Sequence, residues 1–232
     1  MDQPLECPVV TGLPSVAVLG LDAASAAATI ALVDGGLPVT AVTPAPVTPA
    51  ALAALAAYGC ADRVVEVAAG TLRLTSAGVT TTSPAAPPFE IHGAPADPPG
   101  DEASLGTFDA VVLTDGTRAL LPDVADSPRF GGVFDLRTAW VFHLSDAPDL
   151  AGAQGRWIGE YLRGRYAPPD PVAMGAASPS ARGLPWRGGA RAAITELERE
   201  LRAGHARAAS AGYPLPTPPV PPVGPTTPNQ TD

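Results

Sequence analysis

Three residues that could serve phosphate binding follow the first apolar run of the chain, which reads "VAVLGLDAASAAATIALVDGG" from residue 16. In a GxGxxG turn between a strand and a helix, backbone amides touch the pyrophosphate of a dinucleotide, because glycine permits a close approach. Gly20 takes the first glycine position, Asp22 the second and Ser25 the third. Leu32 and Gly36 match the leucine and glycine of the extended pattern. The stretch therefore predicts a βαβ unit of the dinucleotide-binding type.

Asp22 weakens the case for binding and strengthens the case for a helix. A carboxylate repels a pyrophosphate and competes for the same helix N-terminal amides. Aspartate is also a preferred N-cap, so we expect Asp22 to cap the following helix and fill the anion site internally. The acid that usually holds the ribose after the second strand is absent, and Thr43–Pro44 stands there. Gly20, Asp22, Ser25 and Thr43 remain the candidate cofactor contacts of this unit.

A fifth candidate contact is Gly116, which follows the stretch "AVVLTD". Ligands of α/β proteins bind at the carboxyl ends of strands, although a tight turn that requires glycine is the favoured explanation of Gly116. His92, His143 and His205 have no acid or cysteine at a ligand spacing, which argues against a metal site. We interpret His143 as a structural histidine, and no residue is assigned a catalytic role.

Apolar periodicity and turn residues predict alternating strands and helices, and hence an α/β fold with a Rossmann-like parallel sheet flanked by helices. A hairpin that turns at Gly70 is expected from the two short strands Val64–Val67 and Thr71–Thr75. Another strand is expected at Val79–Thr82, and an irregular loop at about residues 83–107 follows it. The other expected strands are Ser15–Gly20, Pro38–Thr43, Ala110–Leu113 and "WVFHL" at 140–144, and the expected helices are Ala23–Asp34, 49–58, Gln154–Tyr166 and Ala190–Ala209.

Charge and composition exclude several classes of protein. The net charge is −9, with 17 acids against five arginines up to residue 150 and six acids against nine afterwards. An acidic first part repels nucleic acid, and the later arginines read as a solvated helix face. No apolar run is long enough to span a bilayer, and no signal peptide is recognisable, so a cytoplasmic location without membrane contact is expected. The sequence defines no oligomeric state.

Two stretches resemble the flavin-containing monooxygenases among the FAD/NAD(P)-binding oxidoreductases. "FDAVVLTDGTR" (108–118) resembles the family strand D-x-V-V-x-A-T-G-Y-R, and "QGRWIGEYLRGRYAPPD" (154–170) resembles its C-terminal helix. A third stretch, 196–219, is similar to the end of bacterial members. The family normally carries two glycine fingerprints and a linking F-x-G-x-x-x-H motif, whereas this chain has one altered fingerprint and no linking motif.

The resemblance implies a shortened, divergent oxidoreductase with FAD and NADP(H) as cofactors and a small organic substrate. Residues 1–150 would then form a Rossmann-like FAD/NAD(P)-binding domain, 151–212 a helical segment packed on it, and 213–232 a disordered proline-rich tail. Two alternatives stay open: a non-catalytic interaction or regulatory protein that keeps the scaffold, and a nucleotide-binding module without flavin.

Overall fold

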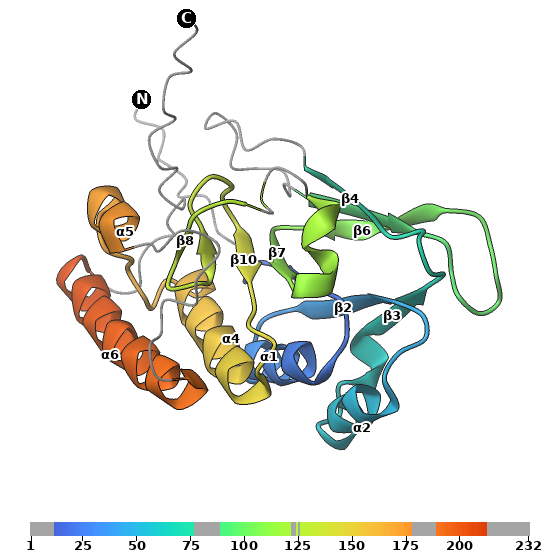
Figure 1. Cartoon of the computed structure of the whole chain (residues 1–232), viewed down its shortest axis with the longest axis horizontal. Coiled ribbons are helices and arrows are strands. Elements are labelled where there is room, and N and C mark those ends of the chain that lie inside the picture. The colour runs from blue at the N-terminus through green and yellow to red at the C-terminus, as the bar shows by residue number, and fades with distance from the viewer. Residues whose placement is uncertain (1–11, 77–88, 122–123, 125, 178–188, 213–232) are drawn as a thin grey trace, which may run out of the picture.

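A seven-stranded sheet forms the centre of the protein (Figure 1). The computed structural model describes residues 12–76, 89–121, 124, 126–177 and 189–212. Five neighbouring strands run parallel and two short strands extend one edge antiparallel. In spatial order they are β3 (Val64–Val67), β2 (Val39–Pro44), β1 (Val16–Leu19), β7 (Ala110–Leu113), β10 (Val141–His143), β9 (Phe134–Asp135) and β8 (Arg129–Phe130).

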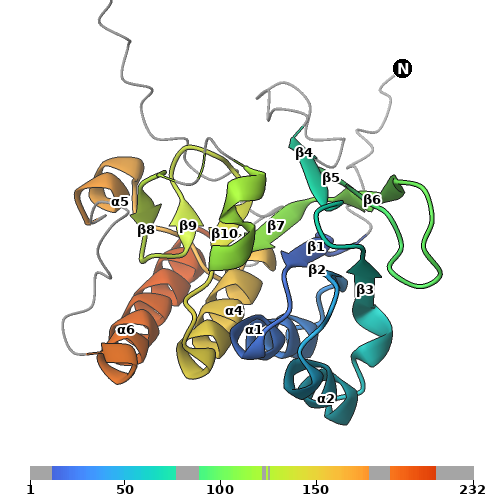
Figure 2. The same ribbon diagram turned by 45° about the vertical axis from the view of Figure 1, so that its right-hand side comes forward.

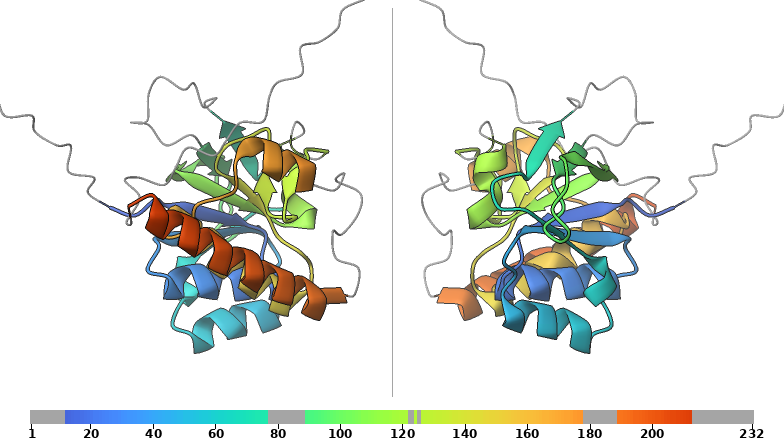
Figure 3. Two further views of the ribbon diagram at one scale, coloured as in Figure 1. Left: turned by 90° about the vertical axis from the view of Figure 1, so that its left-hand side faces the viewer. Right: turned by 90° about the vertical axis from the view of Figure 1, so that its right-hand side faces the viewer.

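The four longest helices lie on one side of this sheet, as the side views in Figure 3 show. Helix α1 (Ala23–Asp34) follows β1 and α4 (Pro148–Leu162) follows β10, and the two pack side by side (Figure 2). Helix α2 (Pro49–Ala57) lies against α1, and α6 (Gly189–Ser210) packs on α4 as an outer layer. The remaining helical pieces are η1 (Ala61–Arg63), η2 (Asp115–Leu120) and α5 (Pro171–Ala177).

A three-stranded antiparallel sheet covers the opposite face. Its order is β4 (Arg73–Ser76), β5 (Phe89–Gly93) and β6 (Ala103–Phe108). Two expectations from the sequence are therefore wrong. Strands β3 and β4 belong to different sheets rather than to one hairpin at Gly70, and the predicted irregular loop contains strand β5 and nearly all of β6. The proline and glycine clusters only separate these strands, and the short apolar alternation of "FEIHG" was too brief to stand out.

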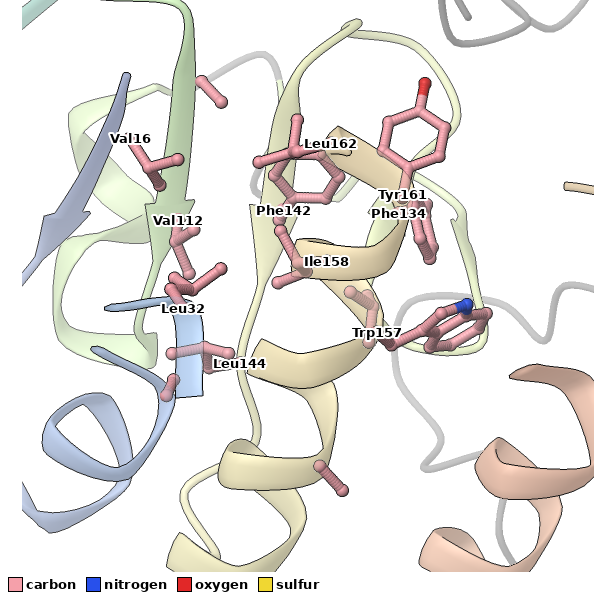
Figure 4. Packing of buried hydrophobic residues seen from close by; sticks show 14 of the residues in the cluster. Val16, Leu32, Val112, Phe134, Phe142, Leu144, Trp157, Ile158, Tyr161 and Leu162 are labelled. Carbon is pink, nitrogen blue, oxygen red and sulfur yellow. The ribbon is translucent and has the colours of Figure 1, made fainter. Parts of the chain in front are cut away.

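Strand β1 shows how the sequence divides the core between the two faces. Val16 belongs to a cluster with Leu32 of α1 and Ile158 of α4 on the helix side of the sheet (Figure 4), and Val18 is a member of the same cluster. The alternate residues Ala17 and Leu19 belong to a second cluster with residues of β4, β5 and β6. All four strand residues are fully buried, as expected for a parallel strand covered on both faces, since side chains alternate along a strand.

The C-terminal helix α6 docks through one aromatic side chain. Tyr166 is fully buried, and its ring lies against Gly204 of α6 so closely that a methyl group on Gly204 would overlap it. The Tyr166 hydroxyl donates to Glu200 Oε1 at 2.7 Å, and the Arg207 guanidinium lies 5.8 Å from the ring centroid. Burial, followed by the charge of Glu200, raises the pKa of this phenol. The helix is thus fixed in register on α4.

Most predicted elements are confirmed, with boundaries shifted by a few residues. Helix α1 has the predicted bounds, whereas α4 begins six residues before and ends four residues before the predicted helix. The prediction of an α/β fold with a mostly parallel sheet flanked by helices is confirmed. The expected strand Val79–Thr82 and the proline-rich tail from Tyr213 lie outside the described residues.

Candidate functional site

The candidate site lies where the strand order reverses, between the carboxyl ends of β1 and β7. From β1 the chain crosses over to β2 and then β3 on one side, whereas β7 leads to β10 on the other side. Leu19 and Leu113 are paired at the ends of the two strands. Open α/β sheets bind ligands in the crevice outside such a switch point. The residues after these two strands therefore decide what the site can hold.

Gly20 makes the turn out of β1, and its conformation requires glycine. Its φ is +87°, and a Cβ atom would lie 2.7 Å from the Thr114 hydroxyl oxygen. The close approach that a dinucleotide fingerprint reserves for a pyrophosphate is used here by a threonine of the neighbouring strand end. Gly20 N also donates to Val42 O at 2.8 Å, which places Thr43 beside it.

Thr114 and Thr117 fill the space next to Gly20. Both are buried, and each hydroxyl donates to Leu19 O at 3.1 Å. Thr114 N in turn donates to Thr117 Oγ1 at 3.1 Å, which caps the short helix η2. No local sequence pattern predicts these contacts, because each joins residues almost a hundred positions apart.

Asp22 caps α1 as the sequence predicts. Asp22 Oδ1 accepts from Ser25 N at 2.8 Å, and Ser25 Oγ accepts from Asp22 N at 2.8 Å. This reciprocal capping box satisfies two amides that would otherwise face an anion. Asp22 is exposed and Ser25 is buried, so the carboxylate lies at the mouth of the site.

Helix α4 begins beside α1 at the same edge of the sheet, because both helices follow parallel strands. Gly155 of α4 touches the backbone of Ala28, and Gly152 lies next to Ala27. The N-cap residue Ala147 has no side-chain cap, and Pro148 takes the first helical position. Two neighbouring helix N-termini thus point to one edge, and only α1 is capped by a side chain.

The remaining predicted contacts lie around this edge. Gly116 is exposed in η2, with no atom within 4 Å of a Cβ built on it. Thr43 is 3% exposed at the end of β2, and its hydroxyl has a weak 3.4 Å contact to Pro44 O. The structure therefore brings Gly20, Asp22, Ser25, Thr43 and Gly116 to the carboxyl edge of three neighbouring strands.

A buried pair that the sequence did not reveal lies one strand further along. His143 Nε2 is 3.1 Å from Asp135 Oδ2, and both side chains are fully buried. Asp135 Oδ1 accepts from Ser127 Oγ, Arg137 N and Thr138 N at 2.7–2.8 Å. Asp135 and His143 come from adjacent short strands, and this pairing has no sequence signature.

Outside this edge, a groove of about 350 Å³ runs between α1, α4 and α6. Arg156, Glu160, Arg163 and His205 line it, and Glu160 pairs with both Arg163 and His205. Arg163 Nη1 also donates to Gly35 O at the end of α1, at 2.8 Å. These contacts tie the three helices together, so Arg156 belongs to this helical groove and not to the switch point.

No protein-family model, curated protein or solved structure matches the chain. Within the described ranges, no three histidine, cysteine or acidic side chains are grouped to hold a metal ion. None of the helices in those ranges combines the length and the apolar character needed to cross a membrane.

Proposed function

We propose that this chain is a shortened, divergent FAD/NAD(P)-dependent oxidoreductase of the flavin-containing monooxygenase type, with its dinucleotide at the carboxyl edge beside Gly20. The observation that carries the proposal is the strand order β3-β2-β1-β7-β10 with a crossover that starts at Gly20. This is the 3-2-1-4-5 order of dinucleotide-binding sheets, whose ligands bind at the reversal point.

Gly20, Thr43 and Gly116 are the residues that would lie against the cofactor, since they end the neighbouring strands or begin η2. A bound flavin supplies the oxygen chemistry and NADP(H) the hydride, while the protein binds and orients both next to a small organic substrate. The N-terminus of α4 lies at the same edge and its N-cap residue Ala147 makes no side-chain cap hydrogen bond, which leaves this helix end as a second place for a phosphate.

The N-terminus of α1 does not fit a pyrophosphate in its usual place. The Asp22 carboxylate already accepts the hydrogen bond of the Ser25 amide, and the Thr114 hydroxyl fills the space beside Gly20 that a pyrophosphate would need. A dinucleotide that used these amides would have to displace a capping interaction and overcome repulsion by a carboxylate.

This misfit favours a second candidate: a non-catalytic interaction or regulatory protein built on the same scaffold. In that case the capping box and the two buried threonines are a permanent replacement for the ligand, and the sheet serves association rather than turnover. The Asp22–Ser25 capping box is the observation that supports it.

A flavin-uptake spectrum of the purified full chain separates the two candidates. The oxidoreductase takes up FAD with the visible absorbance of bound flavin, and its melting temperature rises with ligand concentration. A colourless protein whose melting temperature ignores FAD, NADPH and NADH at millimolar concentration refutes the oxidoreductase and supports the scaffold protein. Stabilisation by NADPH or NADH without flavin uptake indicates a nucleotide-binding module.

Two variants of Asp22 test the role of the carboxylate. Asp22→Gly frees the amide at a cost to the helix of only a few tenths of a kcal/mol, whereas Asp22→Asn keeps an acceptor for Ser25 N but removes the charge. If a dinucleotide binds on α1, affinity rises in both variants and more in the glycine variant. If neither variant changes the affinity, the phosphates bind elsewhere on the edge.

A further inference from the structure

We propose that His143 is a pH-responsive contact that loosens η2, and with it the switch point, when its imidazole takes up a second proton. His143 ends β10, where it pairs with Leu113 of β7 immediately before η2. The inference rests on the proposed function only for its consequence for ligand binding; the structural change itself requires no ligand.

Asp135 determines which ring nitrogen of the neutral His143 imidazole carries the hydrogen. Oδ1 of Asp135 accepts three hydrogen bonds, so the carboxylate is held as an acceptor, and its Oδ2 faces His143 Nε2 at 3.1 Å. The neutral imidazole therefore carries its hydrogen on Nε2. Nδ1 is left as the atom that takes up a proton on acidification, and it is buried without a hydrogen-bond partner.

The surroundings oppose a positive charge at this position. Burial lowers the pKa of His143, and Arg129 of β8 and Arg118 of η2 lower it further, while Asp135 of β9 raises it. Two further carboxylates interact with these guanidinium groups: Asp126 raises the pKa of Arg129, and Asp146 raises the pKa of Arg118. A second proton thus creates a buried cation that two guanidinium groups repel and one carboxylate contacts.

Arg118 is the group that can move in response. Its side chain is 26% exposed, whereas the whole Arg129 residue is 8% exposed. Arg118 Nη2 donates to Leu144 O at 3.1 Å and the guanidinium pairs with Asp115, so it ties η2 to the end of β10. Withdrawal of Arg118 toward solvent relieves the repulsion and releases this tie.

The release reaches the candidate site because η2 carries part of it. Thr117 of η2 donates to Leu19 O beside Gly20, and Gly116 is exposed in the same turn. Loosening η2 therefore weakens the hydrogen bonds that fill the crevice between β1 and β7. Acidification would change the affinity of this edge for a ligand.

Hydrogen–deuterium exchange of the full-length chain tests the proposal, followed in peptides that cover residues 114–121 and corrected for intrinsic exchange rates. Opening that admits solvent to His143 returns its pKa toward the ordinary value of about 6.5, so at about pH 5.5 protonation favours opening by up to about tenfold. We expect protection of this segment to fall by up to that factor between about pH 7.5 and 5.5. Constant protection would overturn the proposal.

His143→Gln is the informative variant, because its side-chain amide can still donate to Asp135 but does not titrate. We expect it to abolish the pH step, while the matched variant His205→Gln, which changes a partly exposed histidine on α6, retains it. An equal step in His143→Gln refutes the proposal. Should that variant not fold, the imidazole titration of His143 in the wild-type NMR spectrum must share its midpoint with the exchange step, and a different midpoint refutes it. Because the readout uses no cofactor, failure to bind flavin leaves this result unaffected.

Discussion

The contact between α1 and α4 predicts that two glycines of one helix respond oppositely to the same substitution. A Cβ atom on Gly155 would lie 2.8 Å from Ala28 O and 2.9 Å from Ala28 Cα. Both atoms belong to the backbone of α1, so no side-chain rotation relieves the clash. A Cβ atom on Gly152 would lie 3.7 Å from Ala27 Cβ, which is an ordinary contact.

The expected magnitudes follow from two terms. Alanine in place of glycine within a helix gains about 1 kcal/mol of stability. Overpacking a core contact costs roughly 1–3 kcal/mol, and more where backbone must move. Gly152→Ala should therefore be neutral or stabilising by up to about 1 kcal/mol. Gly155→Ala should be about 1–3 kcal/mol less stable than Gly152→Ala, and more if the backbone must move, because both gain helix propensity and only Gly155→Ala carries the packing cost.

Urea denaturation followed by far-UV circular dichroism measures both free energies of unfolding. A double variant sharpens the test: Ala28→Gly should not rescue Gly155→Ala, because the clash is with the Ala28 backbone and not with its methyl group. Equal stability of the two single variants, or rescue by Ala28→Gly, would refute the close backbone contact between the helices.

Three further predictions concern stability. Thr29 is fully buried and its hydroxyl has no hydrogen-bond partner, so Thr29→Val should stabilise by about 1 kcal/mol in urea denaturation, with Thr29→Ser as a destabilised control; a loss in the valine variant contradicts this. Gly204→Ala should lower the melting temperature because the methyl group overlaps the Tyr166 ring, whereas Gly175→Ala, with open space around it, should not; similar melting temperatures argue against the docked α6. The lowered folded-state pKa of His143 means that the unfolded chain binds more protons below about pH 6.5, so stability is fully present above that pH and falls on acidification by up to about 1.4 kcal/mol per pH unit. His143→Gln should flatten this slope in urea denaturation from about pH 7.5 to 5, and an unchanged slope would exclude His143 as its source.

The βαβ unit could be predicted from the sequence because its signals are local. A continuous apolar strand, a glycine turn and an N-cap residue lie within a few residues of one another, and helix α1 has the predicted bounds. The capping role of Asp22 was predictable for the same reason. The three-stranded sheet was not, since β4, β5 and β6 are short, and proline-rich and glycine-rich segments separate them.

The contacts that fill the candidate site could not be read from the sequence. Thr114 and Thr117 meet Leu19 O although they lie almost a hundred residues further along the chain, and Asp135 meets His143 only because β9 runs antiparallel to β10. Such pairs depend on strand order and register, which single-sequence patterns do not specify. The position of Gly116 near Gly20 follows from the same strand order.

The polar groups at the switch point already form hydrogen bonds with one another. A ligand that bound there would have to break these bonds, and their free energy would lower its affinity. Thr114 and Thr117 each donate to Leu19 O, and Asp22 accepts from Ser25 N. A side-chain N-cap contributes about 1 kcal/mol and each internal hydrogen bond about 0.5–1.5 kcal/mol. Since about 1.4 kcal/mol corresponds to a factor of ten in affinity, a dinucleotide that displaced only the Asp22 cap would bind several-fold more weakly than to a free helix end. A ligand that also displaced the threonines would lose one to two further orders of magnitude. Weak flavin binding that improves with Asp22→Gly is therefore the outcome that this geometry favours over tight binding by the wild-type chain.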